Sequence, residues 1–170
     1  MEERPHILEA AKSRYNAYDS KDWEKAYFDE HSGGFSVYHK RHQFAKTAGG
    51  GNAEKIVGKM LAKYNSKQVE FLPEGGSKSP DIKFDGRTWD IKYIEKASEH
   101  RIRDAIRDAR KADNAIFYFT DENKSILLNN AITREAGKFL KGQTSKMPDI
   151  YRIDKNGLLK LLWRKTKGAK

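Results

Sequence analysis

Hydrophobic residues follow two different spacings along the chain, and these spacings predict helices alternating with strands. The three-to-four-residue spacing of amphipathic helices covers residues 5–18, 52–64, 98–112 and 125–140. Alternating or short continuous apolar runs typical of strands cover residues 35–39, 68–72, 81–94, 114–119, 150–154 and 158–163. Residues 22–28 are expected to continue the first helix until Gly33-Gly34 ends it. This order predicts an α/β fold of the α+β kind, a mixed sheet with helices on its faces.

Two short turns are predicted inside the strand-rich regions. Asn156-Gly157 predicts a C-terminal β-hairpin, and Asp85-Gly86 predicts a two-residue type I′ turn, because both positions of that turn need positive φ. Pairing across Asp85-Gly86 places Asp81 directly opposite Asp90. A slip of one residue in this register would turn an acidic side chain toward the core.

The predicted hairpin has one charged face and one apolar face, because side chains alternate along each strand. The charged face carries Asp81, Asp90 and Lys92, and the apolar face carries Ile82, Phe84, Trp89 and Ile91. Two neighbouring carboxylates repel each other unless a cation neutralises them. Mg²⁺ or Mn²⁺ suits oxygen-only ligation and would support phosphodiester hydrolysis. Lys92 would then orient water or stabilise charge on the phosphate.

Glu54 is the third carboxylate that could join this site. It lies at the edge of the apolar stripe of the 52–64 helix, from where it can reach past the helix surface. The plainer interpretation of Glu54 is an exposed helical residue. For the hairpin, the plainer interpretation is a solvated polar face in which Lys92 pairs with Asp90.

Other charged and aromatic residues have two interpretations each. Arg103, Arg107 and Arg110 line one flank of the 98–112 helix, either as phosphate contacts or as a solvated flank paired with Glu99 and Asp104. Trp89 is predicted to be core rather than a base-stacking platform. A metal-free acid–base pair of a ribonuclease is a further alternative, drawn from His39, His42 and His100.

Composition narrows the class of partner. The chain has 170 residues, a formal net charge of +10 and a pI near 9.6, which favours a polyanion, with nucleic acid ahead of a membrane surface. There is no cysteine, so disulfides and thiolate metal sites are excluded. No apolar run reaches a membrane span, and the first residues do not resemble an export signal, so we expect a soluble chain. A single folded domain is expected, with an N-terminal extension at 1–48, a core at 49–164 and a basic tail at 165–170.

The order of these residues resembles the PD-(D/E)XK nuclease superfamily. The pattern is an acidic residue on a first helix, a Pro-Asp pair, and an acid-x-Lys triplet on the next strand, here Glu54, Pro80-Asp81 and Asp90-Ile91-Lys92. The wider stretch of roughly residues 50–120 is similar to the C-terminal toxin domains of contact-dependent growth inhibition proteins (CdiA), a group of tRNA nucleases. Asp90 stands where many relatives have Glu, and this shorter side chain would draw a metal closer to the strand.

The resemblance implies a restriction-endonuclease-like αβββαβ core and a metal-dependent nuclease that cleaves tRNA, with DNA as the second candidate substrate. It implies action in the cytoplasm, including that of a target cell, and a cognate immunity protein. Asp81, Asp90, the carbonyl of Ile91 and Glu54 would be metal ligands, and Lys92 the catalytic lysine. The nucleic acid would contact Lys78, Arg103, Arg107 and Arg110. The competing class is a nucleic-acid-binding module without catalysis.

Overall fold

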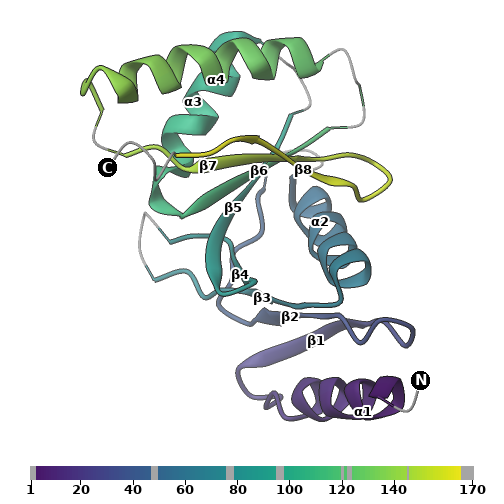
Figure 1. Ribbon diagram of the computed structural model, residues 1–170. Helices are drawn as coiled ribbons and strands as arrows, with labels where there is room; N and C mark the ends of the chain where they lie inside the picture. The colour runs from purple at the N-terminus through teal and green to yellow at the C-terminus, as the bar shows by residue number, and fades with distance from the viewer. Residues whose placement is uncertain are drawn as a thin grey trace. The chain divides into compact units, whose positions relative to one another are not determined.

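The chain folds into two compact units in the computed structural model, unit 1 (Met1–Thr88) and unit 2 (Trp89–Lys170), whose elements are labelled in Figure 1. The structure describes residues 3–46, 50–75, 79–94, 98–119, 121, 124–144 and 146–165.

Unit 1 is built on four strands and two helices. Its elements are α1 (Glu3–Asn16), β1 (Trp23–Phe28), β2 (Phe35–His39), α2 (Gly50–Asn65), β3 (Gln68–Phe71) and β4 (Ile82–Phe84). β1 and β2 pair antiparallel, β2 and β3 pair parallel, and β3 and β4 pair antiparallel. The parallel step is bridged by α2, as a parallel connection requires a crossover.

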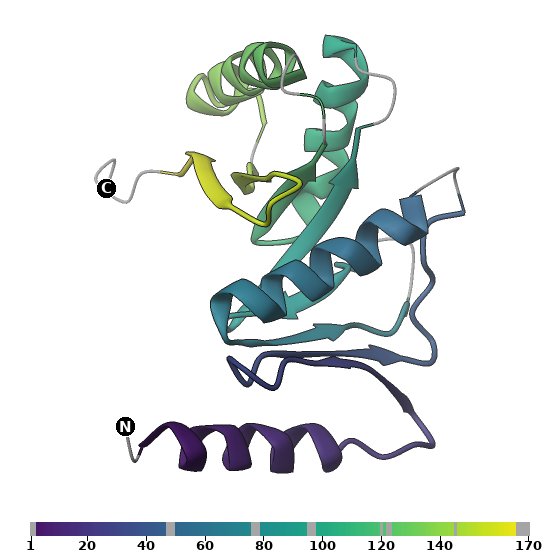
Figure 2. The same ribbon diagram turned by 90° about the vertical axis from the view of Figure 1, so that its right-hand side faces the viewer.

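The two helices of unit 1 lie on opposite sides of its strands (Figures 1 and 2). On the α1 side, Phe35 meets the rings of Tyr15 and Tyr18 at centroid distances of 5.2 and 5.9 Å. On the α2 side, Phe71 is fully buried and lies against Gly58, where an added Cβ would be 2.5 Å from the Phe71 ring. The close approach of α2 to β3 therefore depends on glycine at position 58.

Unit 2 holds the other strands and helices. Its elements are most of β5 (Arg87–Tyr93), then α3 (Glu99–Asp108), a short 3₁₀ turn (Ala109–Lys111), β6 (Asn114–Tyr118), α4 (Lys124–Leu140), β7 (Asp149–Ile153) and β8 (Leu159–Trp163). β5, β6 and β7 are parallel neighbours, and β7 and β8 form an antiparallel hairpin. The α3 and α4 crossovers connect the parallel strands.

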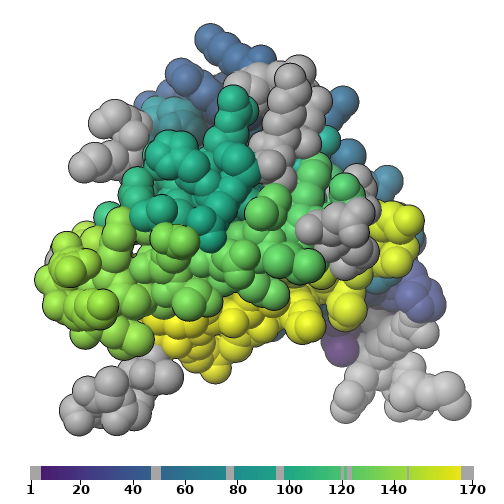
Figure 3. All heavy atoms as spheres, turned by 90° about the horizontal axis from the view of Figure 1, so that it is seen from above, coloured from purple at the N-terminus to yellow at the C-terminus, as the bar shows by residue number. Residues whose placement is uncertain are grey.

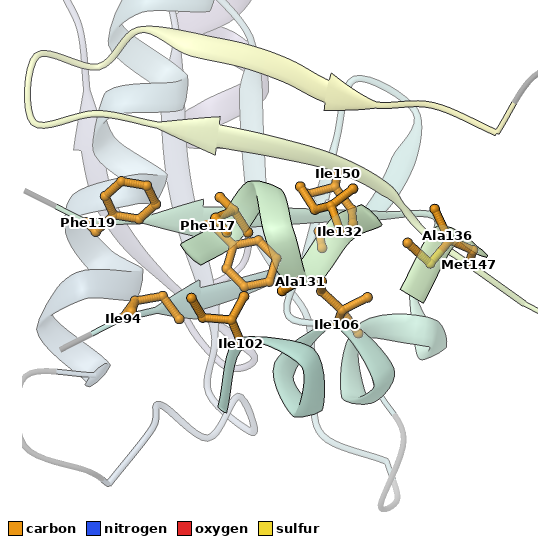
Figure 4. Close-up of a cluster of buried hydrophobic side chains, with 13 residues drawn as sticks. Ile94, Ile102, Ile106, Phe117, Phe119, Ala131, Ile132, Ala136, Met147 and Ile150 are labelled. Atoms are coloured by element: carbon orange, nitrogen blue, oxygen red, sulfur yellow. The ribbon is translucent and has the colours of Figure 1, made fainter. Parts of the chain in front are cut away.

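The core of unit 2 lies between its strands and the helices α3 and α4. Figure 4 shows its side chains meeting from β6, β7 and both helices, including Phe117, Ile102, Ile106 and Ile150, which are fully buried. Seen from above, α4 crosses this face between α3 and β8 (Figure 3). This packing fixes α3 against the strand layer, which matters for the side chains that α3 presents to β5.

The predicted α+β class, with a mixed sheet and flanking helices, is confirmed. The segment α2-β3-β4-β5-α3-β6 has the predicted αβββαβ order. The turn at Asp85-Gly86 is also confirmed, because both residues have positive φ, 53° and 74°. Ser98 caps the N-terminus of α3, because its side-chain oxygen accepts a hydrogen bond from the Arg101 backbone N–H at 3.2 Å.

One element was predicted wrongly. Residues 23–28 form strand β1 and do not continue the first helix, which ends at Asn16. Trp23, Tyr27 and Phe28 favour a pleated, half-buried surface, and antiparallel pairing with β2 supplies partners that local spacing does not reveal.

Some sequence predictions concern residues beyond these elements. The proposed division near residues 48 and 49 lies outside the described residues, as do residues 166–170 of the predicted basic tail at 165–170, and the three-part division of the chain stays a prediction. Within the described part, no helix has the length and apolar character needed to cross a membrane.

Candidate active site

Asp90 is a carboxylate in the interior of unit 2. It occupies the middle of β5, paired in register with Ala115 of β6, and it is fully buried. Neither carboxylate oxygen has a hydrogen-bond partner in the part of the chain that the structure describes. The plainer interpretation of this strand is therefore wrong about a solvated Asp90, although the pairing of Lys92 with Asp90 that it included is present. Buried carboxylates without hydrogen bonds are costly and call for a compensating cation.

Two lysines supply that compensation. Lys92 Nζ lies 3.1 Å from Asp90 Oδ2, and Lys111 Nζ lies 3.5 Å from the same oxygen. The Lys92 and Lys111 side chains are only 17% and 18% exposed, so these charges attract in a poorly solvated environment. The carboxylate is thus balanced by charge without being capped by hydrogen bonds.

Lys92 bridges two carboxylates. Besides Asp90, its ammonium donates to Asp108 Oδ2 at the end of α3. Burial alone would lower the pKa of Lys92, but the negative charge of Asp90, together with the hydrogen bond to Asp108 and the charge of Asp108, outweighs it and raises that pKa. Burial likewise tends to raise the pKa of Asp108, and the Lys92 hydrogen bond lowers it on balance. We call Asp90, Lys92, Asp108 and Lys111 the charged quartet, which has no net formal charge.

The fold of unit 2 explains why these four residues meet. Asp90 and Lys92 are two positions apart on β5, so they share one side of the strand. The last turn of α3 and the 3₁₀ turn after it supply Asp108 and Lys111. Asp108 and Lys111 were not identified from the sequence. Their helical spacing was the available signal, but spacing alone does not say which strand a helix face will meet.

Glu54 and Asp81 belong to unit 1. Glu54 is buried, with 5% exposure, so the interpretation as an exposed helical residue is wrong. Its Oε2 accepts a hydrogen bond from the Ala45 backbone N–H at 2.7 Å. Asp81 is partly exposed, and its carbonyl accepts from the Leu72 backbone N–H at 2.9 Å, beside the end of β3.

His42 is the neighbour of Glu54 that the metal-site prediction did not include. Its Nε2 lies 3.5 Å from Glu54 Oε1, and its Nδ1 lies 2.8 Å from the carbonyl oxygen of Leu72. Burial lowers the pKa of His42, but Glu54, the Leu72 carbonyl and the charge of Asp81 together raise it. The carboxylate of Glu54 is therefore already engaged inside unit 1.

The histidines alone do not assemble an obvious acid–base pair. His42 is buried against Glu54, His39 Nδ1 accepts from the Arg41 backbone N–H at 3.1 Å, and the exposed His100 pairs with Asp104 at 3.3 Å. Each imidazole thus has a partner of a different kind. The metal-free ribonuclease alternative receives no support from these contacts.

The predicted metal site is only partly visible in the geometry. Over the described ranges, no three His, Asp or Glu side chains form a group that could hold a metal ion. Mg²⁺ needs only one or two carboxylates when waters and substrate phosphate complete its shell, and the two unbonded oxygens of Asp90 suit such an ion. Joint binding by Asp81 and Asp90, with the Ile91 carbonyl and Glu54, stays a prediction.

Arg103, Arg107 and Arg110 converge on Glu135 of α4. Arg103 Nε and Arg107 Nε donate to its two carboxylate oxygens at 3.1 and 2.9 Å, and Arg110 Nη2 lies 3.5 Å away. Lys138 Nζ is also 3.5 Å from Glu135, which is completely buried. Hydrogen bonds from Arg107 and Arg103 hold the pKa of Glu135 below its usual value, although burial acts to raise it.

This cluster alters the interpretation of the arginine flank. Glu135 is its main partner, and Asp104 pairs with Arg107 at 3.0 Å, whereas Glu99 pairs with Arg134. The arginines therefore have a structural task in joining α3 to α4. Their contact with nucleic acid stays a prediction, and Lys78 lies outside the described residues.

Comparison with known proteins adds one match. The family model for the contact-dependent growth inhibition CdiA C-terminal domain matches residues 78–159, just under half of the chain. The match includes β5 and α3, and so contains the whole charged quartet. No curated protein and no solved structure matches the chain. Residues 78–159 are thus similar to the C-terminal toxin domain of CdiA.

Proposed function

We propose that this chain is a metal-dependent nuclease that hydrolyses phosphodiester bonds, with tRNA as the favoured substrate and DNA as the second candidate. It would act as the toxin domain of a contact-dependent growth inhibition protein. The observation that carries the proposal is Asp90, a buried carboxylate with no hydrogen bond from the described residues, whose Oδ2 lies 3.1 Å from Lys92 Nζ within the segment that matches the toxin family.

A purely structural role explains this arrangement less well. Buried carboxylates that serve only the fold are normally hydrogen-bonded, as Glu135 is. Asp90 instead keeps both oxygens free of hydrogen bonds among the described residues.

The proposed chemistry divides between a cation and the residues of the charged quartet. Asp90 would hold Mg²⁺ or Mn²⁺, with the Ile91 carbonyl, Asp81 and Glu54 as further candidate ligands. When bound, such an ion supplies Lewis-acid polarisation of the phosphate. Lys92 would orient water or stabilise charge that develops on the phosphate.

Asp108 and Lys111 would be positioning residues in this scheme. Asp108 fixes the Lys92 ammonium by a hydrogen bond, which limits the orientations that this long side chain samples. Lys111 is a second cation beside Asp90 and would be a candidate contact for the substrate phosphate.

The toxin assignment also implies partners. An immunity protein with an acidic face would neutralise a basic toxin, and the target would be in the cytoplasm of the cell that receives it. These statements rest on the similarity of residues 78–159 to the CdiA C-terminal domain.

The direct test is incubation of the full chain with labelled tRNA, and separately with plasmid DNA, in Mg²⁺ and in excess EDTA. We expect tRNA cleavage in Mg²⁺ and none in EDTA. DNA cleavage alone would select the second candidate. Binding of tRNA without cleavage of either substrate would favour the non-catalytic module, and cleavage that persists in EDTA would exclude the metal.

A further inference from the structure

Helix α2 of unit 1 presents a row of three lysines to solvent. Lys55, Lys59 and Lys63 are all exposed and follow one another at four-residue spacing, so they lie on one face of the helix. Successive lysines are about 6 Å apart along the helix axis, and the row spans about 12 Å. We call these three residues the lysine row.

The lysine row carries uncompensated positive charge. Glu54 is the acidic residue of α2, and it is buried on another side of the helix, against Ala45 and His42. Among the described residues, none of the three lysines is in an ion pair with a carboxylate. Two other exposed lysines of unit 1 differ, since Lys12 pairs with Glu30 at 3.3 Å and Lys67 pairs with Asp85 at 3.1 Å.

Aromatic rings accompany each of these ammonium groups. Lys55 Nζ lies 4.7 Å from the centroid of Phe44, Lys59 Nζ lies 4.9 Å from Tyr27, and Lys63 Nζ lies 5.3 Å from Tyr64. A cation–π contact holds a lysine in place without neutralising its charge. Tyr64 is itself 56% exposed and offers a ring face at the end of the row.

The combination of ordered lysines and accessible rings suits the backbone of a nucleic acid strand. Lysine ammoniums contact phosphates without reading sequence, and aromatic rings can stack against unpaired bases. A lipid surface fits less well, because most of the apolar stripe of α2 that would enter it is already buried and Ile56, at 45% exposure, is its main exposed aliphatic side chain. That stripe includes Ala53, Val57 and Leu61, each at most 2% exposed.

We infer that the lysine row of α2 is a binding surface for the phosphate backbone of the nucleic acid substrate, supported by the rings of Tyr27, Phe44 and Tyr64. This inference rests on the proposed function for its choice of ligand. It assigns sequence-independent affinity to unit 1, to residues outside the charged quartet and outside the arginine flank.

The test is the salt dependence of tRNA binding, measured by fluorescence anisotropy in excess EDTA and in an Asp90→Asn background, which together should suppress cleavage. The variant Lys55→Gln, Lys59→Gln, Lys63→Gln is compared with its parent from about 50 to about 200 mM salt. The slope of log Kobs against log salt is negative, and the loss of three phosphate contacts should make it shallower by about 2 to 3. Binding at the low-salt end should weaken at least tenfold. Glutamine keeps helix propensity, so the unfolding midpoint should stay unchanged.

The matched control is Lys12→Gln, Lys21→Gln, Lys25→Gln. These lysines are also exposed residues of unit 1, and the control removes the same number of positive charges as the row variant. The control should make the slope of log Kobs against log salt shallower by far less than the row variant does. Equal slopes for the two variants would overturn the inference, because net charge alone would then explain binding.

Two further results separate this inference from others. If the row variant loses affinity for polyglutamate but not for tRNA, the surface binds an acidic protein and the inference is wrong. If the wild-type chain cleaves tRNA but the row variant and the control variant have equal slopes, the lysine row is refuted and the proposed nuclease function is kept. Absence of cleavage by the wild-type chain, with a reduced slope for the row variant, would refute the nuclease and keep the binding surface.

Discussion

The charged quartet shows how single residues depend on one another inside unit 2. Asp90 has two lysines beside it, and Lys92 is shared between Asp90 and Asp108. Removing one member of a poorly solvated ion pair leaves its partner uncompensated. The effect of a substitution should therefore depend on which neighbour loses its only counter-charge.

Asp108→Asn tests the positioning role at the edge of the quartet. Lys92 would keep Asp90 but lose its hydrogen bond to Asp108, so its ammonium would be less fixed. We expect a loss in the cleavage rate of about 10- to 100-fold, as for other groups that orient a functional residue. The measurement is kcat and KM for tRNA, and the loss should fall on kcat.

Asp104→Asn is the matched control for Asp108. It removes an exposed carboxylate one helical turn earlier on α3, where the partners are Arg107 and His100. Its kcat should match that of the wild type. An equal loss of kcat in both variants would mean that general changes in α3, and not the Lys92 contact, lower the rate.

Glu135→Gln tests the buried carboxylate that joins α3 to α4. The substitution leaves Arg103, Arg107 and Arg110 facing a neutral group, so it should destabilise the protein by about 3 kcal/mol at pH 7. Urea unfolding measures this loss. Asp104→Asn, which removes an exposed partner of Arg107, should cost less than about 1 kcal/mol.

The pH dependence of this effect follows from the lowered pKa of Glu135. Because the folded-state pKa lies below the unfolded value of about 4.3, the stabilisation is present above that pH. It is lost as pH falls through the folded pKa. The stability difference between wild type and Glu135→Gln should therefore shrink below about pH 4, and a constant difference down to acid pH would contradict the assignment.

At the scale of elements, the α2–β3 contact explains a glycine inside a helix. A Cβ on Gly58 would lie 2.5 Å from the Phe71 ring, closer than side chains pack. Gly137, in the interior of α4, has no heavy atom within 4 Å of the corresponding position. Identical substitutions at the two sites should therefore have opposite effects.

Gly58→Ala should destabilise the protein by about 1 to 3 kcal/mol, since overpacking against Phe71 exceeds the gain in helix propensity. Gly137→Ala should stabilise it by up to about 1 kcal/mol. Chemical denaturation of both variants checks the signs. Stabilisation by Gly58→Ala would mean that α2 does not pack as closely on β3 as described.

Element prediction from the sequence succeeded where local signals agree with tertiary packing. Helices α2, α3 and α4 have regular apolar stripes, and the turn at Asp85-Gly86 has residues that tolerate positive φ. Strand β1 was missed because its partner, β2, supplies most of the reason for its extended form. Pairing between strands is a tertiary property that periodicity does not contain.

Over the whole molecule, the sequence indicated which residues belong to the candidate site better than it indicated which side chains those residues contact. It identified Asp90 and Lys92 as one site, and unit 2 does place them 3.1 Å apart. It did not reveal Asp108, Lys111 or Glu135 as partners, because these contacts depend on how α3 and α4 pack. The burial of Glu54 likewise depends on Ala45 and His42, which lie outside the helix that carries it.

The basic residues behind the net charge of +10 are paired with carboxylates in some parts of the chain and not in others. Arg103 and Arg107 of α3 form ion pairs with Glu135. The lysines of the charged quartet are balanced by Asp90 and Asp108. The lysine row of α2 has no such carboxylates among the described residues. A count of basic residues predicts a polyanionic partner, but only the contacts show which cations remain available to bind it.

Single-turnover cleavage of tRNA in Mg²⁺ by Asp90 variants measures the catalytic role that we propose for this carboxylate. Asp90→Asn should lower the rate by about 10² to 10³, whereas Asp90→Glu, which keeps the charge, should retain measurable cleavage. Lys92→Gln provides a second test if Asp90→Asn fails to fold, since Lys111 still balances Asp90 in that variant. Cleavage at the wild-type rate by a folded Asp90→Asn or Lys92→Gln protein would show that the residue changed is not needed for catalysis.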